Sequence, residues 1–326
     1  MQAGQRAPEL PFGIAILGPT GSGKSRLAMR VAAGRPVEII SVDSAQVYRG
    51  LDIGTAKPTA DERRAVPHHL IDIRDPEQSY SAGEFRSDCV ALIRDIGARG
   101  RVPLLVGGTM LYYRALFGGI AELPTADGAI RAALDARAAR AGWPALHAEL
   151  ALRDPLGAAR IHPHDAQRIQ RALEVLALSG QTQTAHWSSA AHGSSGFEHW
   201  LICMLEPGDR ARLHAAQAER IELMLRDGFL EEVRGLLARG LKSDAPVLRL
   251  VGYRQFVAHC RGLESLQDAT VRALAATRQL AKRQLTWMRS GKLLPYGATV
   301  LRADPFEPHS VAAVTRGLIE APAAPC

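Results

Sequence analysis

The sequence predicts an α/β fold with a mostly parallel sheet and an all-helical insertion. In the first 120 residues, short apolar runs alternate with segments of helical character, which is typical of a parallel sheet covered by helices. From about residue 120 to 198 only helical signals occur, and then an apolar run and long helical segments follow. We therefore expect a discontinuous core of residues 10–119 and 199–315, interrupted by a helical domain at 120–198.

The strands of the core are predicted from apolar runs that end at glycine or at a polar residue. Such runs are typical of buried parallel strands. The first half of the chain contains four of them: residues 12–17 (FGIAIL), 37–43 (VEIISVD), a short candidate at 70–73, and 102–108 (VPLLVGG). A fifth run, residues 199–206 (HWLICMLE), follows the predicted insertion.

Helices are predicted between and after these strands. Ser81 and Glu84 have the spacing of a capping box, and Gly100 follows the end of the same helix. In the insertion, Asp165 is a plausible N-cap of a helix that ends at Gly180. Further helices are expected at residues 25–34, 209–240 and 269–291, with one short helix within 305–326.

Composition sets broad limits on the function. The 326 residues carry a net charge of +7, and 47% are hydrophobic, which is compatible with a globular protein that has a polyanionic partner. No run of 18 apolar residues and no signal peptide is visible, and the four cysteines have no metal or disulfide spacing. We expect a cytoplasmic protein with no membrane contact, and a monomer because no self-associating heptad seam is present.

The stretch GPTGSGKS, which lies between the first predicted strand and helix, has the pattern of a phosphate-binding loop. Its glycines allow backbone N–H groups to turn toward phosphate oxygens, and the following helix adds a positive potential. Lys24 supplies a charge, and the Ser25 hydroxyl can bind Mg²⁺, the cofactor that we expect. The residues of the loop are Gly18, Pro19, Thr20, Gly21, Ser22, Gly23, Lys24 and Ser25.

The acidic residue near this loop has an unusual position. Nucleotide-hydrolysing proteins with such a loop usually carry an acid at the end of a later strand. Here the strand 102–108 is followed by Thr109, and the acid is Asp43, at the end of the second strand. The carboxyl ends of parallel strands share one edge of the sheet, so we expect the loop, Asp43 and Thr109 to converge. Asp43 could be a general base, a Mg²⁺ ligand or a helix cap.

Several longer stretches have a specific pattern in addition. They are SVDSAQVYRGLDIGTAKP, PHHLIDIRDP, YSAGEFRSD, LLVGGTMLYYRALFGG, IHPHDAQRIQRALEVLALSG, VGYRQF and TRQLAKRQLTWMR. In order and spacing, residues 13–289 resemble the bacterial tRNA dimethylallyltransferases. The resemblance implies a phosphate-loop NTPase-like core and transfer of a dimethylallyl group from dimethylallyl diphosphate to N6 of the adenosine 3′-adjacent to the anticodon. Diphosphate is then the leaving group, Mg²⁺ assists, and the glycine loop holds the diphosphate rather than ATP.

The resemblance also implies roles for residues outside the glycine loop. Asp43 and Thr109 correspond to the catalytic pair, and Arg131 to an arginine near the reacting groups. The predicted helical insertion would grip the anticodon arm, and the target adenosine would be extruded from the RNA. The residues that the resemblance and the basic patches assign to tRNA are Asp43, Ser44, Ala45, Gln46, Gln167, Arg168, Ile169, Gln170, Arg171, Arg249, Gly252, Tyr253, Arg254, Lys282, Arg283 and Arg289.

Two other functions use the same glycine loop. A small-molecule kinase would transfer the γ-phosphate of ATP, with Asp43 beside it, and a non-catalytic RNA-binding NTPase switch would bind a nucleotide without changing the RNA covalently. The chain also departs from its relatives in one place: Ala216 stands where they often carry an arginine. The C-terminal cysteines of the eukaryotic zinc finger are absent from the sequence, which indicates the bacterial form.

Overall fold

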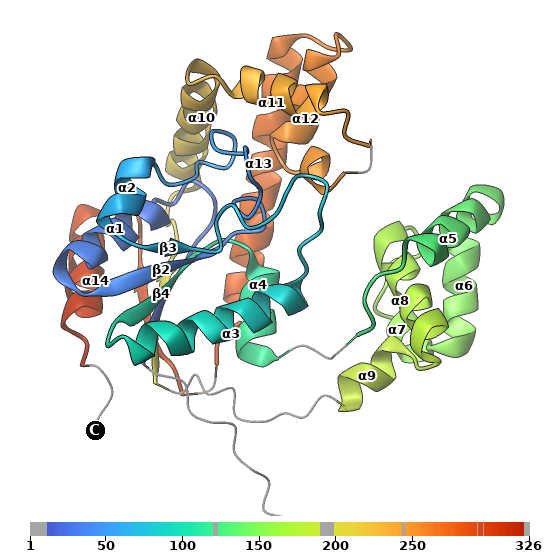
Figure 1. The fold of residues 1–326 in the computed structure, drawn as a ribbon, viewed down its shortest axis with the longest axis horizontal. Helices are drawn as coiled ribbons and strands as arrows, with labels where there is room; N and C mark the ends of the chain where they lie inside the picture. Colours follow the sequence, from blue (N-terminus) through green and yellow to red (C-terminus); the bar gives the residue numbers. More distant parts are fainter. Residues whose placement is uncertain are drawn as a thin grey trace, which may run out of the picture. The chain divides into compact units, whose positions relative to one another are not determined.

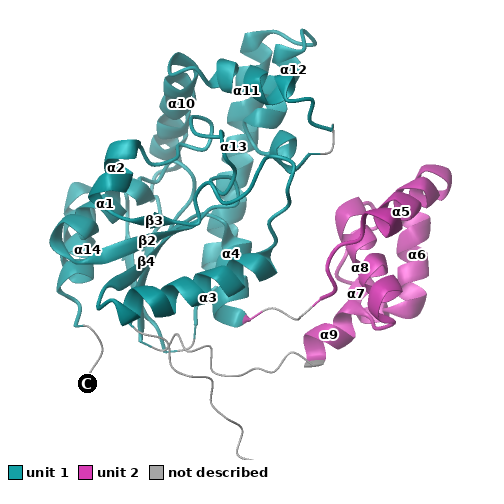
Figure 2. Cartoon of the chain, viewed as in Figure 1, with its two compact units in different colours: residues 1–118, 194–326 teal, residues 119–193 magenta. Residues whose placement is uncertain are grey.

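The computed structural model describes residues 12–119, 123–189, 199–242, 245–291, 293–295 and 297–322. The chain divides into two compact units, one made of residues 1–118 and 194–326 and the other of residues 119–193 (Figure 2). We call them unit 1 and unit 2 and describe each by itself.

Unit 1 is built on a six-stranded sheet with the order β3-β2-β4-β1-β5-β6 (Figure 1). Every pairing between its neighbouring strands is parallel, which confirms the predicted α/β class with a mostly parallel sheet. The strands are β1 (Gly13–Leu17), β2 (Val37–Val42), β3 (His68–His69), β4 (Val102–Gly107), β5 (Trp200–Leu205) and β6 (Thr299–Ala303).

Helices cover both faces of this sheet. Because side chains alternate along a strand, β1 supplies Ile14 and Ile16 to one buried cluster and Ala15 and Leu17 to another. The first cluster contains residues of α1 (Lys24–Gly34) and α14 (Pro308–Glu320); the second contains residues of α3 (Ala82–Ala98), α4 (Met110–Gly118) and α13 (Leu266–Arg289). A short helix, α2 (Ala60–Ala65), precedes β3.

A third apolar cluster joins the C-terminal helices to the chain that follows β2. Val47, Tyr48 and Leu51 pack in this cluster with residues of the helices. The helices are therefore fixed against residues that lie just after a strand end of the sheet. The elements involved are α10 (Arg210–Arg226), α11 (Phe229–Ala238), the 3₁₀ helix η1 (Pro246–Arg249), α12 (Tyr253–Cys260) and α13.

Unit 2 consists of helices around a small apolar core. The core is formed by residues such as Leu134, Leu146, Leu150 and Ile169. Its elements are α5 (Gly128–Ala141), α6 (Trp143–Arg153), α7 (Pro155–Ala158), α8 (Ala166–Ser179) and α9 (Gln183–Ser189).

The helix ends that were predicted from capping patterns are confirmed. Ser81 accepts a hydrogen bond from the backbone N–H of Glu84, whose side chain bonds back in a capping box. Asp165 accepts from the backbone N–H of Arg168, and Gly180 ends α8 in a left-handed conformation.

The strand predicted in HHLIDI, around residues 70–73, forms only over the first two residues of this stretch. β3 contains only His68–His69, because Leu70 and Asp72 have φ values of 59° and 56°, which a strand cannot accommodate. Ion pairs from Lys57 and Arg63 hold Asp72 in this turn. The sequence analysis did not identify the edge strand β6 or the helix α4.

Helices long and apolar enough to cross a membrane are absent from the part of the chain that the structure describes.

One buried carboxylate allows the stability of unit 2 to be tested. Glu174 is fully buried and accepts hydrogen bonds from Arg131 (2.8 Å), Arg171 (2.6 Å) and the backbone N–H of Asp127 (2.8 Å). Burial by itself would raise the pKa of Glu174, but these hydrogen bonds lower it overall. A lowered pKa in the folded state means that the ion pair stabilises the fold at neutral pH and loses this effect as the pH falls through the folded pKa.

We expect Glu174→Gln to destabilise unit 2 by about 1–3 kcal/mol at pH 7, and by progressively less as the pH falls below the ordinary carboxyl pKa of 4.5 and through the lowered folded pKa, where the wild type also loses the interaction. Amide hydrogen exchange of peptides from residues 123–189 measures this. Glu149→Gln is the matched control, because the Glu149 carboxylate pairs with Arg137 at the surface of the same unit and should change exchange little. Equal exchange in both variants at pH 7 would contradict the prediction.

Candidate active site

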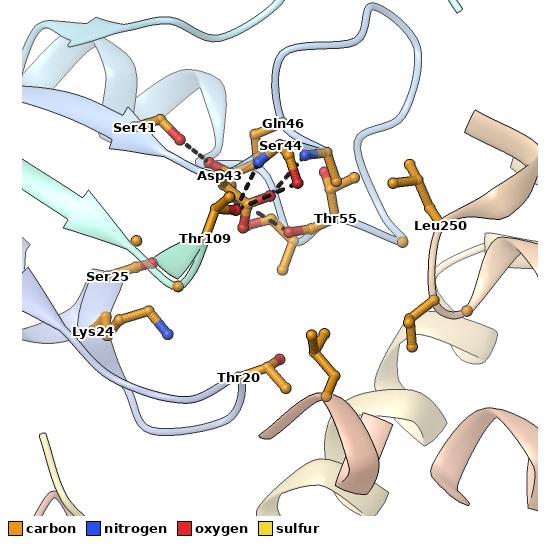
Figure 3. A pocket seen from close by; sticks show the side chains of 18 of the residues that line it. Thr20, Lys24, Ser25, Ser41, Asp43, Ser44, Gln46, Thr55, Thr109 and Leu250 are labelled. Carbon is orange, nitrogen blue, oxygen red and sulfur yellow. Dashed lines mark hydrogen bonds between the residues drawn. The ribbon is translucent and has the colours of Figure 1, made fainter. Parts of the chain in front are cut away.

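The glycine loop between β1 and α1 has the geometry of an anion site. Gly21 and Gly23 have φ values of 85° and 72°, a conformation that glycine adopts without strain. Gly23 precedes α1 without a side-chain cap, so the first N–H groups of the helix remain directed outward. The amine of Lys24 donates to the carbonyl oxygen of Pro19 (2.8 Å). In Figure 3, Lys24 and Thr20 extend from the loop toward the cavity.

Two glutamines from the C-terminal helices hold this loop. Gln284 accepts a hydrogen bond from the backbone N–H of Thr20 (2.9 Å) and donates to the carbonyl oxygen of Gly108 (2.8 Å). Gln217 donates to the carbonyl oxygen of Thr20 (3.0 Å). A Cβ at Gly108 would lie only 2.5 Å from Nε2 of Gln284, so this position requires glycine. Gln284 thereby joins the glycine loop to the end of β4.

Asp43 and Thr109 lie at the ends of β2 and β4. A carboxylate oxygen of Asp43 accepts from the backbone N–H of Ala45 (2.8 Å). The hydroxyl oxygen of Thr109 accepts from the backbone N–H of Ser44 (3.0 Å). The half-buried side chain of Asp43 and the Thr109 hydroxyl line the same cavity as Lys24, and Figure 3 shows Asp43 and Thr109 across the cavity from Thr20.

The cavity has a volume of about 550 Å³ and lies in unit 1. Its lining is polar at the glycine loop and after β2, whereas the C-terminal helices and the segment between η1 and α12 add both polar side chains and apolar ones such as Leu250, which faces the cavity (Figure 3). The apolar part includes Ile221, Met224, Leu250, Val251 and Leu280. The cavity can therefore hold a ligand that has an anionic end and an apolar end.

Arg220 of α10 is a cavity residue that the sequence analysis missed. Its guanidinium donates to the carbonyl oxygen of Thr55 (3.4 Å). Burial lowers the pKa of Arg220, and the nearby Asp43 opposes this. Burial, followed by the charge of Arg220, lowers the pKa of Lys24 to about 8, again opposed by Asp43. Two cationic side chains therefore lie close together beside Asp43 in this cavity.

Hydrogen bonds to other parts of the protein fix the orientation of the Gln46 amide group. Ser41 donates to its oxygen (2.8 Å), and its nitrogen donates to the carbonyl oxygens of Thr55 and Ala56 (3.3 Å each). Both ends of the Gln46 amide, which lines the cavity, are thus defined by hydrogen bonds. This is the arrangement expected of a group that distinguishes one hydrogen-bonding ligand from another.

The residues of unit 2 that were predicted to bind tRNA differ in exposure. Gln167 and Arg168 are exposed on α8, whereas Ile169 is fully buried in the core of the unit. Gln170 donates to Asp135 (2.7 Å), and Arg171 is paired with Glu174. Arg131, predicted near the reacting groups, also pairs with Glu174 within unit 2.

Among the residues of unit 1 predicted to bind tRNA, those that line the cavity are Asp43, Ser44, Ala45, Gln46, Arg249, Gly252, Tyr253 and Arg283. Tyr253 is buried, and its hydroxyl donates to Glu232 (2.6 Å). The remaining three, Arg254, Lys282 and Arg289, are exposed on α12 and α13.

The sequence model of one protein family, described as IPP transferase, matches residues 46–291. The chain belongs to the IPP transferase family. A tRNA dimethylallyltransferase of Bordetella petrii is 56% identical over 279 residues, which cover 85% of this chain and 89% of that protein. One from Chromobacterium violaceum is 53% identical, covering 89% of this chain and 90% of its own length.

Solved structures of the IPP transferase family have the same fold. The tRNA isopentenylpyrophosphate transferase of Bacillus halodurans is 33% identical with a TM-score of 0.65, covering 96% of this chain and 97% of that one. A eukaryotic dimethylallyltransferase acting on tRNA is 26% identical with a TM-score of 0.78, covering 97% of this chain and 82% of that one.

The role of Gln284 can be tested by ligand binding. Gln284→Ala removes both hydrogen bonds that join Thr20 to Gly108, so we expect magnesium diphosphate to bind about tenfold more weakly. Isothermal titration calorimetry measures this affinity. Thr286→Ala is the control, because Thr286 is exposed on the same helix and bonds only to the carbonyl oxygen of Lys282. An unchanged affinity for Gln284→Ala would show that the bridge does not order the loop.

Proposed function

We propose that the protein transfers a dimethylallyl group from dimethylallyl diphosphate to N6 of the adenosine 3′-adjacent to the anticodon of tRNA, with release of diphosphate. The observation that carries the proposal is the cavity in which Asp43 and the glycine loop with Lys24 line one space, in a chain of the IPP transferase family. A carboxylate suits a weakly acidic amine, and a cationic loop suits a departing anion.

The anionic end of the donor would lie on the glycine loop. The N–H groups at the start of α1, the amine of Lys24 and the guanidinium of Arg220 are positive partners for diphosphate oxygens. As the bond between carbon and diphosphate breaks, negative charge grows on the leaving group, and these groups stabilise it. The Thr109 hydroxyl accepts from the backbone N–H of Ser44 and donates to the Ser44 hydroxyl (3.4 Å), and it would donate to the diphosphate oxygens by turning this proton away from Ser44.

The residues present also fit a magnesium ion. Mg²⁺ is usually bound through one or two protein oxygens, substrate phosphates and waters, and the hydroxyl of Ser25 lines the cavity. Among the described side chains, no group of three or more His, Cys, Asp or Glu is arranged to hold a metal, so diphosphate oxygens would complete the coordination. When bound, the cation would neutralise charge on the diphosphate.

Asp43 is proposed to act on the acceptor amine. The N6 nitrogen of adenine forms a bond to the allylic carbon while the bond from that carbon to the diphosphate oxygen breaks, and the N6 proton passes to the carboxylate of Asp43. The apolar lining around Leu250 and Leu280 would hold the hydrocarbon and keep water from the allylic carbon.

The target base must leave the stack of the anticodon loop to reach this cavity. We propose that Ser44, Ala45 and Gln46 contact the extruded adenosine. The exposed Gln167 and Arg168 of unit 2 and the exposed Lys282 and Arg289 of unit 1 would bind the RNA backbone, since arginine and lysine pair with phosphates.

The decisive assay combines the protein with unmodified tRNA, Mg²⁺ and dimethylallyl diphosphate, followed by mass analysis of the nucleosides. A gain of one dimethylallyl group on adenosine, with one diphosphate released per transfer, is expected. A parallel sample with γ-labelled ATP tests phosphoryl transfer. Label in a product without prenylated adenosine would replace the proposal with a kinase activity.

Asp43→Asn tests the role of the carboxylate. The amide has nearly the same size but cannot accept the proton, so kcat should fall by about 100- to 10,000-fold while tRNA binding stays within about twofold of wild type. Single-turnover kinetics and a filter-binding assay measure the two quantities. Asp75→Asn, at an exposed ion pair with Arg49, serves as the control. Turnover that survives in Asp43→Asn would remove Asp43 from the proton transfer.

The role of Arg131 can be distinguished from that of Glu174 with two variants that break the ion pair between them. Arg131→Gln and Glu174→Gln both remove the ion pair between these two residues, and Glu174→Gln also weakens the contact with Arg171. If Arg131 also acts near the reacting groups, Arg131→Gln should lower kcat at saturating tRNA at least tenfold further, since only this variant removes a charge from the reaction. Equal kcat values would assign Arg131 to the structure of unit 2.

A further inference from the structure

Glu232 of α11 binds a loop of the backbone that follows β2. One of its carboxylate oxygens accepts from the backbone N–H groups of Asp52 (2.7 Å) and Ile53 (2.8 Å). The other oxygen accepts from the backbone N–H of Gly54 (3.0 Å) and from the hydroxyl of Tyr253 (2.6 Å). Hydrogen bonds to a carboxylate are shorter and stronger than those between neutral groups, so one side chain fixes three consecutive peptide groups.

The packing around Gly54 leaves this loop no other position. A Cβ at Gly54 would lie 2.2 Å from a ring carbon of Phe229 and 2.6 Å from the hydroxyl of Tyr253. The two rings themselves pack edge to face, with centroids 5.0 Å apart. The backbone of the loop therefore rests directly on the first residues of α11 and α12, and glycine is required there.

Lys57 anchors the other end of the loop. Its buried amine donates to the carbonyl oxygen of Tyr48 (2.8 Å) and to the carboxylates of Asp52 and Asp72 (2.6 Å each). Ala56, the residue before it, has a φ of 47°, which costs a non-glycine residue free energy. Contacts at both ends of residues 52–57 offset this strain.

The carbonyl groups of Thr55 and Ala56, which lie between the segment held by Glu232 and the residue Lys57, point at cavity residues. The carbonyl oxygens of Thr55 and Ala56 accept from the Gln46 amide, and that of Thr55 also accepts from Arg220. A direct chain of bonds therefore leads from Glu232, through the backbone of residues 52–54, to Gln46 and Arg220. The backbone of Thr20 in the glycine loop bonds instead to Gln217 and Gln284.

We infer that Glu232 is a positioning residue for the acceptor side of the cavity: with Tyr253, it holds the loop of residues 52–56 so that Gln46 is aimed at the extruded adenosine. This inference rests on the proposed function. It also gives Tyr253 a different role from the predicted tRNA contact, because its hydroxyl bonds to Glu232. Neither Glu232 nor Tyr253 needs to touch the reacting atoms.

The test compares Glu232→Gln with Glu231→Gln. In Glu232→Gln the amide nitrogen faces N–H donors, so kcat/KM for tRNA should fall about 10- to 100-fold, while the Kd for magnesium diphosphate stays within about twofold. Glu231 is exposed on the same helix and pairs only with Arg234 among the described ion pairs, so Glu231→Gln should match the wild type.

Tyr253→Phe removes one of four hydrogen bonds and should show a smaller loss. Glu232→Asp, which keeps the charge, should recover part of the rate.

Two outcomes of these kinetic and binding measurements would overturn the inference. One is a Glu232→Gln enzyme with the tRNA kinetics of Glu231→Gln. The other is a diphosphate affinity that falls in parallel with turnover, because that indicates a general loss of structure. Hydrogen exchange of peptides covering residues 50–58 separates this inference from the proposed function. Faster exchange in Glu232→Gln shows that Glu232 holds the loop of residues 52–56, even if the wild type fails to prenylate tRNA. Unchanged exchange rejects this role of Glu232.

Discussion

The parallel pairing of β1, β4 and β2 is the constraint on which the active site depends. Leu17 pairs with Gly107, and Gly107 pairs with Val42, so these three strands end at the same level. The residues that come next are Gly18, Gly108 and Asp43. Because parallel strands share one carboxyl edge, this register alone brings the glycine loop, the acid and Thr109 together without any contact between their side chains.

The C-terminal helices turn this edge of the sheet into a cavity. Gln217 and Arg220 of α10, Glu232 of α11 and Gln284 of α13 each bond to the backbone of a segment that follows a strand. The third apolar cluster holds these helices against Val47 and the residues after it. Gln284 thus supports the glycine loop, and Glu232 supports the loop of residues 52–56. For this reason, variants at Gln284 and Glu232 should affect the binding of the two proposed substrates differently.

Holding the positive charges of Lys24 and Arg220 close together in a buried cavity costs free energy. Burial and the neighbouring Arg220 lower the pKa of Lys24 to about 8, and Asp43 only partly opposes this. Like charges in a desolvated space repel each other, whereas a diphosphate would bring several negative charges. The same arrangement would therefore favour the binding of a diphosphate donor and stabilise the leaving group.

Local patterns in the sequence determined the glycine loop, the end of β2 at Asp43 and the caps at Ser81, Asp165 and Gly180, because each depends on neighbouring residues only. The sequence missed Arg220, Glu232, Gln217 and Gln284, since a polar residue on an amphipathic helix has the same pattern whether it faces solvent or a cavity. It also misjudged residues 70–73, where Lys57 and Arg63 bend the chain. Those positions depend on contacts between residues far apart in the chain, and only tertiary packing decides which peptide groups a helix side chain meets.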